Sequence, residues 1–184
     1  MQLYEAGFIG AGNMGGALMD AALKYTKNVA AYDTDEAKAR ARGTAVLSPA
    51  ELAASSHYVF IGVKPDTVEQ VAKTVAPALR EYSVIVSMAA GVDLKTLTRL
   101  FKTEKIIRIM PNTPVSVGAG MILYAPAAGV TDVDEESFLA LMTYAGRTEK
   151  LDESKIDAGM AVSGCGPAYV YMFCEALADG GYLF

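Results

Sequence analysis

The feature that most constrains the fold of this chain is a set of three glycines close to its start. They stand at positions 10, 12 and 15, directly after the apolar run 6–9 and directly before the helix-like segment 13–24. In such a G-x-G-x-x-G turn the first glycine permits a tight turn, the second lets the backbone approach a pyrophosphate, and the third lets helix and strand pack closely. The pattern predicts a strand–turn–helix unit whose helix N-terminus can bind phosphate. The alternative is a tight turn without a ligand.

A carboxylate stands where such a site would need one. Asp33 follows the second apolar run, 29–32, about 20 residues beyond the glycine turn, the usual place of the acidic residue that binds the ribose hydroxyls of NAD. A negative charge there would repel the extra phosphate of NADP. We therefore expect NADH or NADPH as cofactor, with NADH favoured by Asp33. The alternative for Asp33 is a cap for the helix that Thr34 opens.

Short apolar runs alternate with helix-like segments along the chain. We expect strands at residues 6–9, 29–32, 45–47, 58–63, 84–88, 106–110, 121–125 and 147–151. We expect helices at residues 13–24, 35–42, 49–55, 66–76, 93–101, 132–145 and 168–178. This alternation predicts an α/β fold, a Rossmann-type doubly wound and mostly parallel sheet with helices on both faces.

Several helix ends carry local signals. Thr34 can cap the helix 35–42, which Gly43 would stop, and residues 66–69 read as a capping box. Asp93 is a cap for the helix that ends near residue 101.

Two further strand ends carry residues suited to a ligand. Gly62-Val63-Lys64-Pro65 ends the fourth strand, and Met88-Ala89-Ala90-Gly91 ends the fifth. Ligands of parallel sheets bind at the carboxyl ends of the strands. Lys64 could meet a phosphate or a ribose hydroxyl there, and the small residues could admit a flat nicotinamide ring. The alternatives are a surface lysine and simple close packing.

Composition excludes several classes of protein. The 184 residues include 16 Lys and Arg against 21 Asp and Glu, a net charge of −5, which disfavours a nucleic-acid surface. A hydrophobic fraction of 52% excludes a disordered chain. No apolar run is long enough for a membrane span, and no signal peptide is visible, so we expect a cytoplasmic protein without a membrane partner. His57 reads as a surface residue at a strand start, and we expect no metal site.

The last segment differs from the rest. Residues 163–167 read as a tight turn into the helix 168–178, which is apolar almost all round and must be covered. Cys165 and Cys174 read as buried small side chains in this region. The chain then ends at Phe184 with no further helix. We expect either a truncated chain or a segment completed by a partner subunit.

Taken together, these pieces resemble the N-terminal part of the pyrroline-5-carboxylate reductase family. The resemblance lies in the glycine turn and in five later motifs, of which Met-Pro-Asn-Thr-Pro and Ser-Gly-x-Gly-Pro-Ala are the most specific. The later motifs are V-K-P at 63–65, S-M-A-A-G at 87–91, R-I-M-P-N-T-P at 108–114, S-G-C-G-P-A-Y at 163–169 and E-A-L-A-D-G-G at 175–181. The resemblance implies reduction of 1-pyrroline-5-carboxylate to L-proline by hydride transfer from NAD(P)H, in proline biosynthesis.

The resemblance also implies site residues. Glu153 would approach the substrate amine, although its alternative is an exposed carboxylate in a turn, and no catalytic residue is assigned. Members that use NADPH often carry a small hydroxyl residue in place of Asp33, and many carry an asparagine where Pro49 stands. The residues implied to bind the cofactor are Ile9, Gly10, Ala11, Gly12, Asn13, Met14, Gly15, Asp33, Val63, Lys64, Pro65, Met88, Ala89 and Ala90.

The resemblance sets the expected domain organisation and leaves alternatives for the function. We expect a dinucleotide-binding domain at 1–162 and the first helix of a truncated, all-helical dimerisation domain at 163–184. A homodimer or larger assembly would form through that helical region. A non-catalytic dinucleotide-binding fragment remains an alternative, as does another imine or keto-acid reductase of the same domain type, against which the run Met110–Pro114 speaks.

Overall fold

The computed structural model describes residues 3–42 and 45–182, within which one sheet carries most of the fold. Its strands are β1 (Tyr4–Ile9), β2 (Val29–Tyr32), β3 (Ala45–Val46), β4 (Ser56–Ile61), β5 (Val84–Ser87), β6 (Ile106–Pro111), β7 (Gly120–Pro126) and β8 (Gly146–Lys150). The α-helices are α1 (Asn13–Tyr25), α2 (Glu36–Arg40), α3 (Pro49–Ser55), α4 (Val68–Val75), α5 (Leu94–Phe101), α6 (Asp132–Leu141), α7 (Ile156–Ser163) and α8 (Gly166–Tyr182). Short 3-10 turns include η1 (Pro65–Thr67), η3 (Thr113–Val117) and η4 (Glu153–Lys155).

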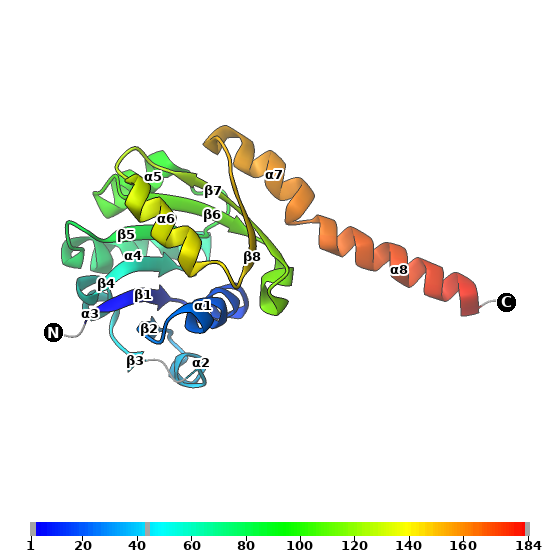
Figure 1. Ribbon diagram of the computed structural model, residues 1–184, viewed down its shortest axis with the longest axis horizontal. Helices are drawn as coiled ribbons and strands as arrows, with labels where there is room; N and C mark the ends of the chain where they lie inside the picture. The colour runs from blue at the N-terminus through cyan, green and yellow to red at the C-terminus, as the bar shows by residue number, and fades with distance from the viewer. Residues whose placement is uncertain (1–2, 43–44, 183–184) are drawn as a thin grey trace.

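The strand order confirms the expected doubly wound sheet. It runs β3-β2-β1-β4-β5-β6-β7-β8, and every neighbouring pair is parallel except β6 and β7. From β1 the chain first moves outward through β2 and β3, then returns to the other side of β1 with β4 (Figure 1). The order therefore reverses between β1 and β4, and ligands of such sheets bind at this reversal.

Each face of the sheet packs against its own helices. Phe8 and Phe60 stack with ring centroids 4.3 Å apart in the layer that α1 and α6 cover. Ile9 and Ile61, the next residues along the same strands, point to the opposite layer, which α3, α4 and α5 cover. Alternate residues of a strand face opposite sides, so strands covered on both faces are apolar at nearly every position. The apolar runs seen in the sequence are explained by this burial.

Several helix boundaries differ from the expected ones. The residue that caps α2 is Asp35, whose side chain accepts from the Ala37 N–H, and not Thr34. The expected capping box at 66–69 is wrong: Pro65 opens the 3-10 turn η1, and α4 begins only at Val68 without a side-chain cap. Gly43, the expected stop of α2, lies outside the described residues.

Helix α6 also ends earlier than expected. It begins after Thr131, whose side chain forms a capping box with Asp134, and it ends at Leu141 instead of near Ala145. The Ala145 carbonyl accepts a hydrogen bond from the Gly120 N–H at 3.0 Å. After α6 the chain makes tight turns, in which the Thr143 N–H donates to the Ala140 carbonyl and the Ala145 N–H to the Met142 carbonyl, and it then enters β8, which pairs with β7.

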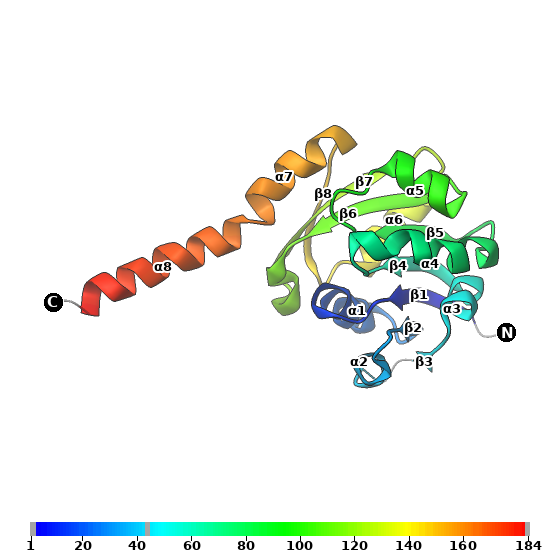
Figure 2. The same ribbon diagram turned by 180° about the vertical axis from the view of Figure 1, so that it is seen from behind.

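The C-terminal part leads away from the sheet. Helix α7 was not expected from the sequence, and α8 is longer than the expected 168–178 (Figures 1 and 2). A Cβ at Gly159 would lie 2.5 Å from the Leu123 side chain, so glycine at this point of α7 permits close packing on β7. No residue of α8 within the described part is buried. Cys174 is exposed and Cys165 half-buried, which corrects their expected burial in this chain.

Candidate functional site

Four parallel strands end at one level and form an edge suited to a ligand. Ile9, at the end of β1, pairs with Tyr32 of β2 and with Ile61 of β4. Ile61 in turn pairs with Ser87 at the end of β5. The loops that follow these strands therefore lie side by side, on both sides of the point where the strand order reverses. The glycine turn occupies the middle of this edge.

The three glycines of the turn serve two different purposes. Gly10 has a φ of 100°, and a Cβ there would lie 2.6 Å from the Gly62 carbonyl oxygen. A Cβ at Gly15 would overlap the Gly10 carbonyl oxygen. Gly12, in contrast, has an ordinary φ of −67°, and a Cβ there would meet nothing within 4 Å. Gly10 and Gly15 are thus required by packing, whereas Gly12 faces an open cradle that a side chain would fill.

The helix that follows presents free backbone donors to that cradle. Gly12 is the N-cap residue of α1 and supplies no side-chain cap, and no acidic residue lies in the first turn. The first N–H groups of a helix have no partner inside the helix and carry the positive end of its dipole. Asn13 is exposed and Met14 is half-buried at this turn. The arrangement fits a pyrophosphate, as the glycine pattern predicted.

Asp33 is held in place by backbone on both sides. Its Oδ2 accepts the Ala11 N–H at 2.7 Å, and its Oδ1 accepts the Asp35 N–H at 2.9 Å. Each carboxylate oxygen has a further lone pair. The carboxylate is therefore oriented toward the glycine turn and can still accept hydrogen bonds from a ligand. It combines the expected position for a ribose with a structural role in the turn after β2.

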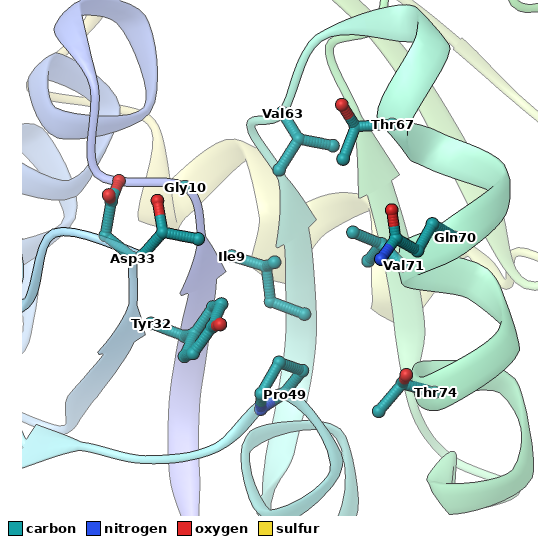
Figure 3. Close-up of a pocket in the computed structure, with 11 residues that line it drawn as sticks. Ile9, Gly10, Tyr32, Asp33, Pro49, Val63, Thr67, Gln70, Val71 and Thr74 are labelled. Carbon is teal, nitrogen blue, oxygen red and sulfur yellow. The ribbon is translucent and has the colours of Figure 1, made fainter.

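A hollow of about 270 Å³ opens beside Asp33 at this edge (Figure 3). One wall comes from the ends of β1 and β2, and Figure 3 shows Asp33 next to Gly10 on that side. The opposite wall comes from α4, which faces it across the end of β4. Pro49 also lines the hollow, where it offers no side-chain donor. The lining residues that the sequence did not indicate for a ligand site are Tyr32, Thr34, Thr67, Gln70, Val71 and Thr74.

The remaining residues expected at the cofactor lie on the neighbouring loops. Val63 lines the hollow, Lys64 is exposed, and Pro65 opens η1 after β4. The segment 88–90 follows β5, with Ala89 buried and Ala90 exposed. The fold thus brings residues 9–15, 33, 63–65 and 88–90 to one edge. Their contact with a cofactor stays a prediction.

Glu153 occupies a more specific place than the sequence indicated. Its Oε1 accepts the Leu94 N–H, the first of α5, at 2.6 Å and the Arg108 Nη1 at 3.3 Å. Arg108 is only 3% exposed and also contacts the Asp157 Oδ1 at 2.7 Å through Nη2. Its Nε has no hydrogen-bond partner among the described residues. Glu153 therefore joins the start of α5, β6 and the segment leading to α7.

This ion-pair cluster lies beside the loop that carries the expected nicotinamide contacts. The loop 88–93 ends at the N-terminus of α5, which Glu153 binds. Arg108 pairs in the sheet with Ser87, the last residue of β5. The carboxylate of Glu153 is already engaged by two donors, so a role toward a substrate stays a prediction.

Other polar groups lie away from this edge. His57, near the start of β4, is 3.5 Å from the Asp134 Oδ1 through Nε2. Its side chain is 31% exposed, in agreement with the expected surface position at a strand start. Across residues 3–42 and 45–182, no group of three or more His, Cys, Asp or Glu side chains is arranged to hold a metal ion. In the same part of the chain no helix is long and apolar enough to cross a membrane.

Comparison with known proteins agrees with the geometry. The family model described as NADP oxidoreductase coenzyme F420-dependent matches residues 5–91. The model described as pyrroline-5-carboxylate reductase dimerisation matches residues 153–183. The second match starts before the boundary expected at 163 and includes η4 and α7. That boundary stays a prediction.

Curated relatives extend the match over nearly the whole chain. Pyrroline-5-carboxylate reductases from Escherichia coli (strain K12) and Pisum sativum are 37% and 36% identical, each over 97% of this chain. This chain covers 70% and 68% of those proteins, respectively. A crystal structure of Plasmodium falciparum pyrroline carboxylate reductase with NADP bound is 29% identical and has a TM-score of 0.87. That match covers 99% of this chain and 70% of the other.

The open glycine cradle, the carboxylate after β2 and the order of the strands thus occur together with similarity to one group of enzymes over 97% of this chain. The chain belongs to the pyrroline-5-carboxylate reductase family of nicotinamide-dependent oxidoreductases.

Proposed function

We propose that this chain takes part in the reduction of 1-pyrroline-5-carboxylate to L-proline, with a reduced nicotinamide dinucleotide bound at the edge of the sheet. One observation carries the proposal: Gly12 faces open space in a turn whose other glycines are tightly packed. A fold that needed only a tight turn would not need glycine at this position. The proposed substrate follows from the sequence similarity to pyrroline-5-carboxylate reductases, which extends over 97% of the chain.

The proposed placement of the cofactor follows from the edge. Gly12 and the first N–H groups of α1 would hold its pyrophosphate, and Asp33 would bind its adenine ribose. The hollow between β2 and α4 would accept the adenine end, and the segment 88–90 would line the nicotinamide end. When bound, the dinucleotide supplies the hydride that reduces the C=N carbon.

The chain's own contribution is positioning. Reduction of an imine that is already protonated needs little further acid or base, so binding and alignment supply most of the catalysis. The turn 10–15 and Asp33 orient the cofactor, and the ion pairs of Glu153 and Arg108 hold the nicotinamide-side loop against β6. We further propose that Glu153 approaches the substrate amine, as the family resemblance implies.

The preference for NADH over NADPH is a further part of the proposal. Asp33 presents an oriented carboxylate where the ribose hydroxyls lie, and two backbone amides hold it there. A carboxylate accepts hydrogen bonds from free hydroxyls and repels a phosphate. We expect Asp33→Ser to raise the use of NADPH relative to NADH. An unchanged ratio of the two dissociation constants would contradict this assignment.

The variant Gly12→Ala tests the site itself. A methyl group at this position meets no atom within 4 Å and has an allowed φ, so the fold should be unaffected. The methyl group would nevertheless stand where the pyrophosphate approaches. We expect NADH affinity, followed by nicotinamide fluorescence, to fall at least about tenfold, the loss that follows from a clash worth roughly 1.4 kcal/mol.

Gly180→Ala is the matched control, because Gly180 lies in α8 and a Cβ there also meets nothing within 4 Å. It should leave NADH binding unchanged. Unaltered binding in Gly12→Ala would refute the proposed cofactor position. Proline-dependent reduction of NAD⁺ at alkaline pH then tests the reaction, and binding without turnover would favour the non-catalytic alternative for this chain.

Assembly and location complete the proposal. Similarity to the dimerisation model supports a homodimer or larger assembly through the helical region that begins near residue 153. The cytoplasmic location expected from the sequence stays a prediction.

A further inference from the structure

A second hollow adjoins the first on the far side of Asp33. Its volume is about 360 Å³, and it lies between α2 and the stretch from the end of β3 to the start of α3. Tyr32, Asp33 and Thr34 line both hollows. A ribose bound to Asp33 would therefore stand at the boundary between them. The residues that line the second hollow are Tyr32, Asp33, Thr34, Glu36, Arg40, Val46, Leu47 and Ser48.

The charged side chains of this second hollow are already paired. Glu36 Oε2 accepts from Arg40 Nε at 3.1 Å and from Arg40 Nη2 at 2.8 Å. With Asp33 included, the hollow holds two carboxylates and one guanidinium. Its net charge is negative, although it contains the kind of cation that usually binds phosphate.

The other cations around α2 are paired in the same manner. Lys38 Nζ lies 3.7 Å from Asp35 Oδ2, and Arg42 Nε lies 2.7 Å from Asp20 Oδ1. A site for the 2′-phosphate of NADPH requires a cation that is available to that phosphate. Here each of these cations faces a carboxylate of the chain itself, and Arg40 alone among them lines the hollow.

We propose that Glu36 is a second specificity-determining residue, which excludes the 2′-phosphate of NADPH by holding Arg40 and by adding a negative charge beside Asp33. The proposal rests on the proposed binding of the adenine ribose at Asp33. It assigns the preference for NADH to a pair of carboxylates, Asp33 after β2 and Glu36 of α2, and not to Asp33 alone. Arg40 then becomes a phosphate ligand as soon as Glu36 is neutralised.

The test compares NADH and NADPH dissociation constants, followed by nicotinamide fluorescence on the full 184-residue chain. Glu36→Gln should improve NADPH binding about fivefold relative to NADH, the effect that an exposed charge interaction can produce. The gain should shrink in high salt, because both side chains are more than half exposed. In the double variant Glu36→Gln with Arg40→Gln, most of the gain should disappear.

Glu69→Gln is the matched control. Glu69 pairs with Lys73 at 3.2 Å on α4, in the same spacing and with similar exposure, but lines neither hollow. It removes the same charge and should leave the ratio of the two constants unchanged. A ratio that moves equally in Glu69→Gln would show a general charge effect and overturn the proposal.

Two further outcomes decide the matter. An unchanged ratio in Glu36→Gln, or a gain that persists fully without Arg40, would refute the role of Glu36 while leaving NADH binding at Asp33 intact. Failure of the unaltered chain to bind either nucleotide would overturn the proposed function together with this inference.

Discussion

The sheet and helix α8 use similar apolar side chains to opposite effect. Phe8 and Phe60 are completely buried and stacked on each other, whereas Phe173 and Tyr169 on α8 are 65% and 62% exposed. The apolar residues of the sheet pack against other residues of the same chain. Helix α8 presents them outward on an arm that leaves the sheet (Figure 2). An apolar helix face of this size is typical of a surface that another chain or segment covers.

An apolar composition alone therefore does not distinguish a core from an interface. Both regions are apolar, but the apolar residues of the sheet are buried within this chain, whereas those of α8 are not. The match of residues 153–183 to a dimerisation model agrees with this difference. The two regions should therefore respond differently to the same substitutions.

The largest expected effect comes from a matched pair of phenylalanine substitutions. Phe60→Ala removes a fully buried ring and should lower the free energy of unfolding by about 3–5 kcal/mol. Phe173→Ala should change it by less than about 0.5 kcal/mol, because its ring is exposed in the single chain. Urea denaturation at low protein concentration measures both. Similar losses of stability in the two variants would show that Phe173 is packed as well as Phe60 in the single chain, contrary to this expectation.

A smaller effect is expected where the two regions meet. Arg108→Met leaves Glu153 and Asp157 without their buried partner and should cost about 2–3 kcal/mol. Proteolysis between η4 and α7 should also become faster. Arg147→Met is the control, because that side chain is 74% exposed in its pair with Glu149, and it should cost almost nothing. Equal stability of the two variants would show that the ion pairs of Arg108 do not stabilise the junction between the sheet and α7.

The smallest of the three effects concerns a buried carboxylate of the sheet region. Burial by itself would raise the pKa of Asp134, but hydrogen bonds from Lys105 and Thr131 outweigh it and lower the pKa from 3.8 to about 2. Asp134→Asn should therefore cost about 2 kcal/mol at neutral pH.

The pH dependence gives this prediction its sign. Since the folded-state pKa is depressed, the stabilisation by Asp134 is complete above about pH 4 and disappears as the pH falls through 2. The difference between the original chain and Asp134→Asn should vanish over this window in acid denaturation. A constant difference across the window would show that the carboxylate acts through packing alone.

Much of the site could be predicted because its signals are local. The glycine turn, the carboxylate after the second strand and the cap at Asp93 each depend on residues within a few positions of one another. Local sterics and helix-end hydrogen bonds act over the same range. The sheet could be predicted in the same way, because short apolar runs alternate with helix-like segments along the chain.

The helix predictions from the sequence were wrong where a contact with a distant segment is part of the structure. Gly159 weakens the helical pattern of residues 156–163, but its lack of a side chain lets α7 pack on Leu123 of β7. After the end of α6, the Ala145 carbonyl accepts a hydrogen bond from the Gly120 N–H of β7. Neither partner is visible in the segment itself.

The amino-acid sequence alone determined which residues could bind a dinucleotide and which family the chain resembles, because glycine turns and strand-end carboxylates are read over short distances. Only the tertiary structure decided how those residues meet. The register that aligns Ile9, Tyr32, Ile61 and Ser87, the wall that α4 contributes to the hollow, and the pairing of Glu153 with Arg108 all join distant segments. Such contacts follow from strand order and packing, which no local pattern specifies.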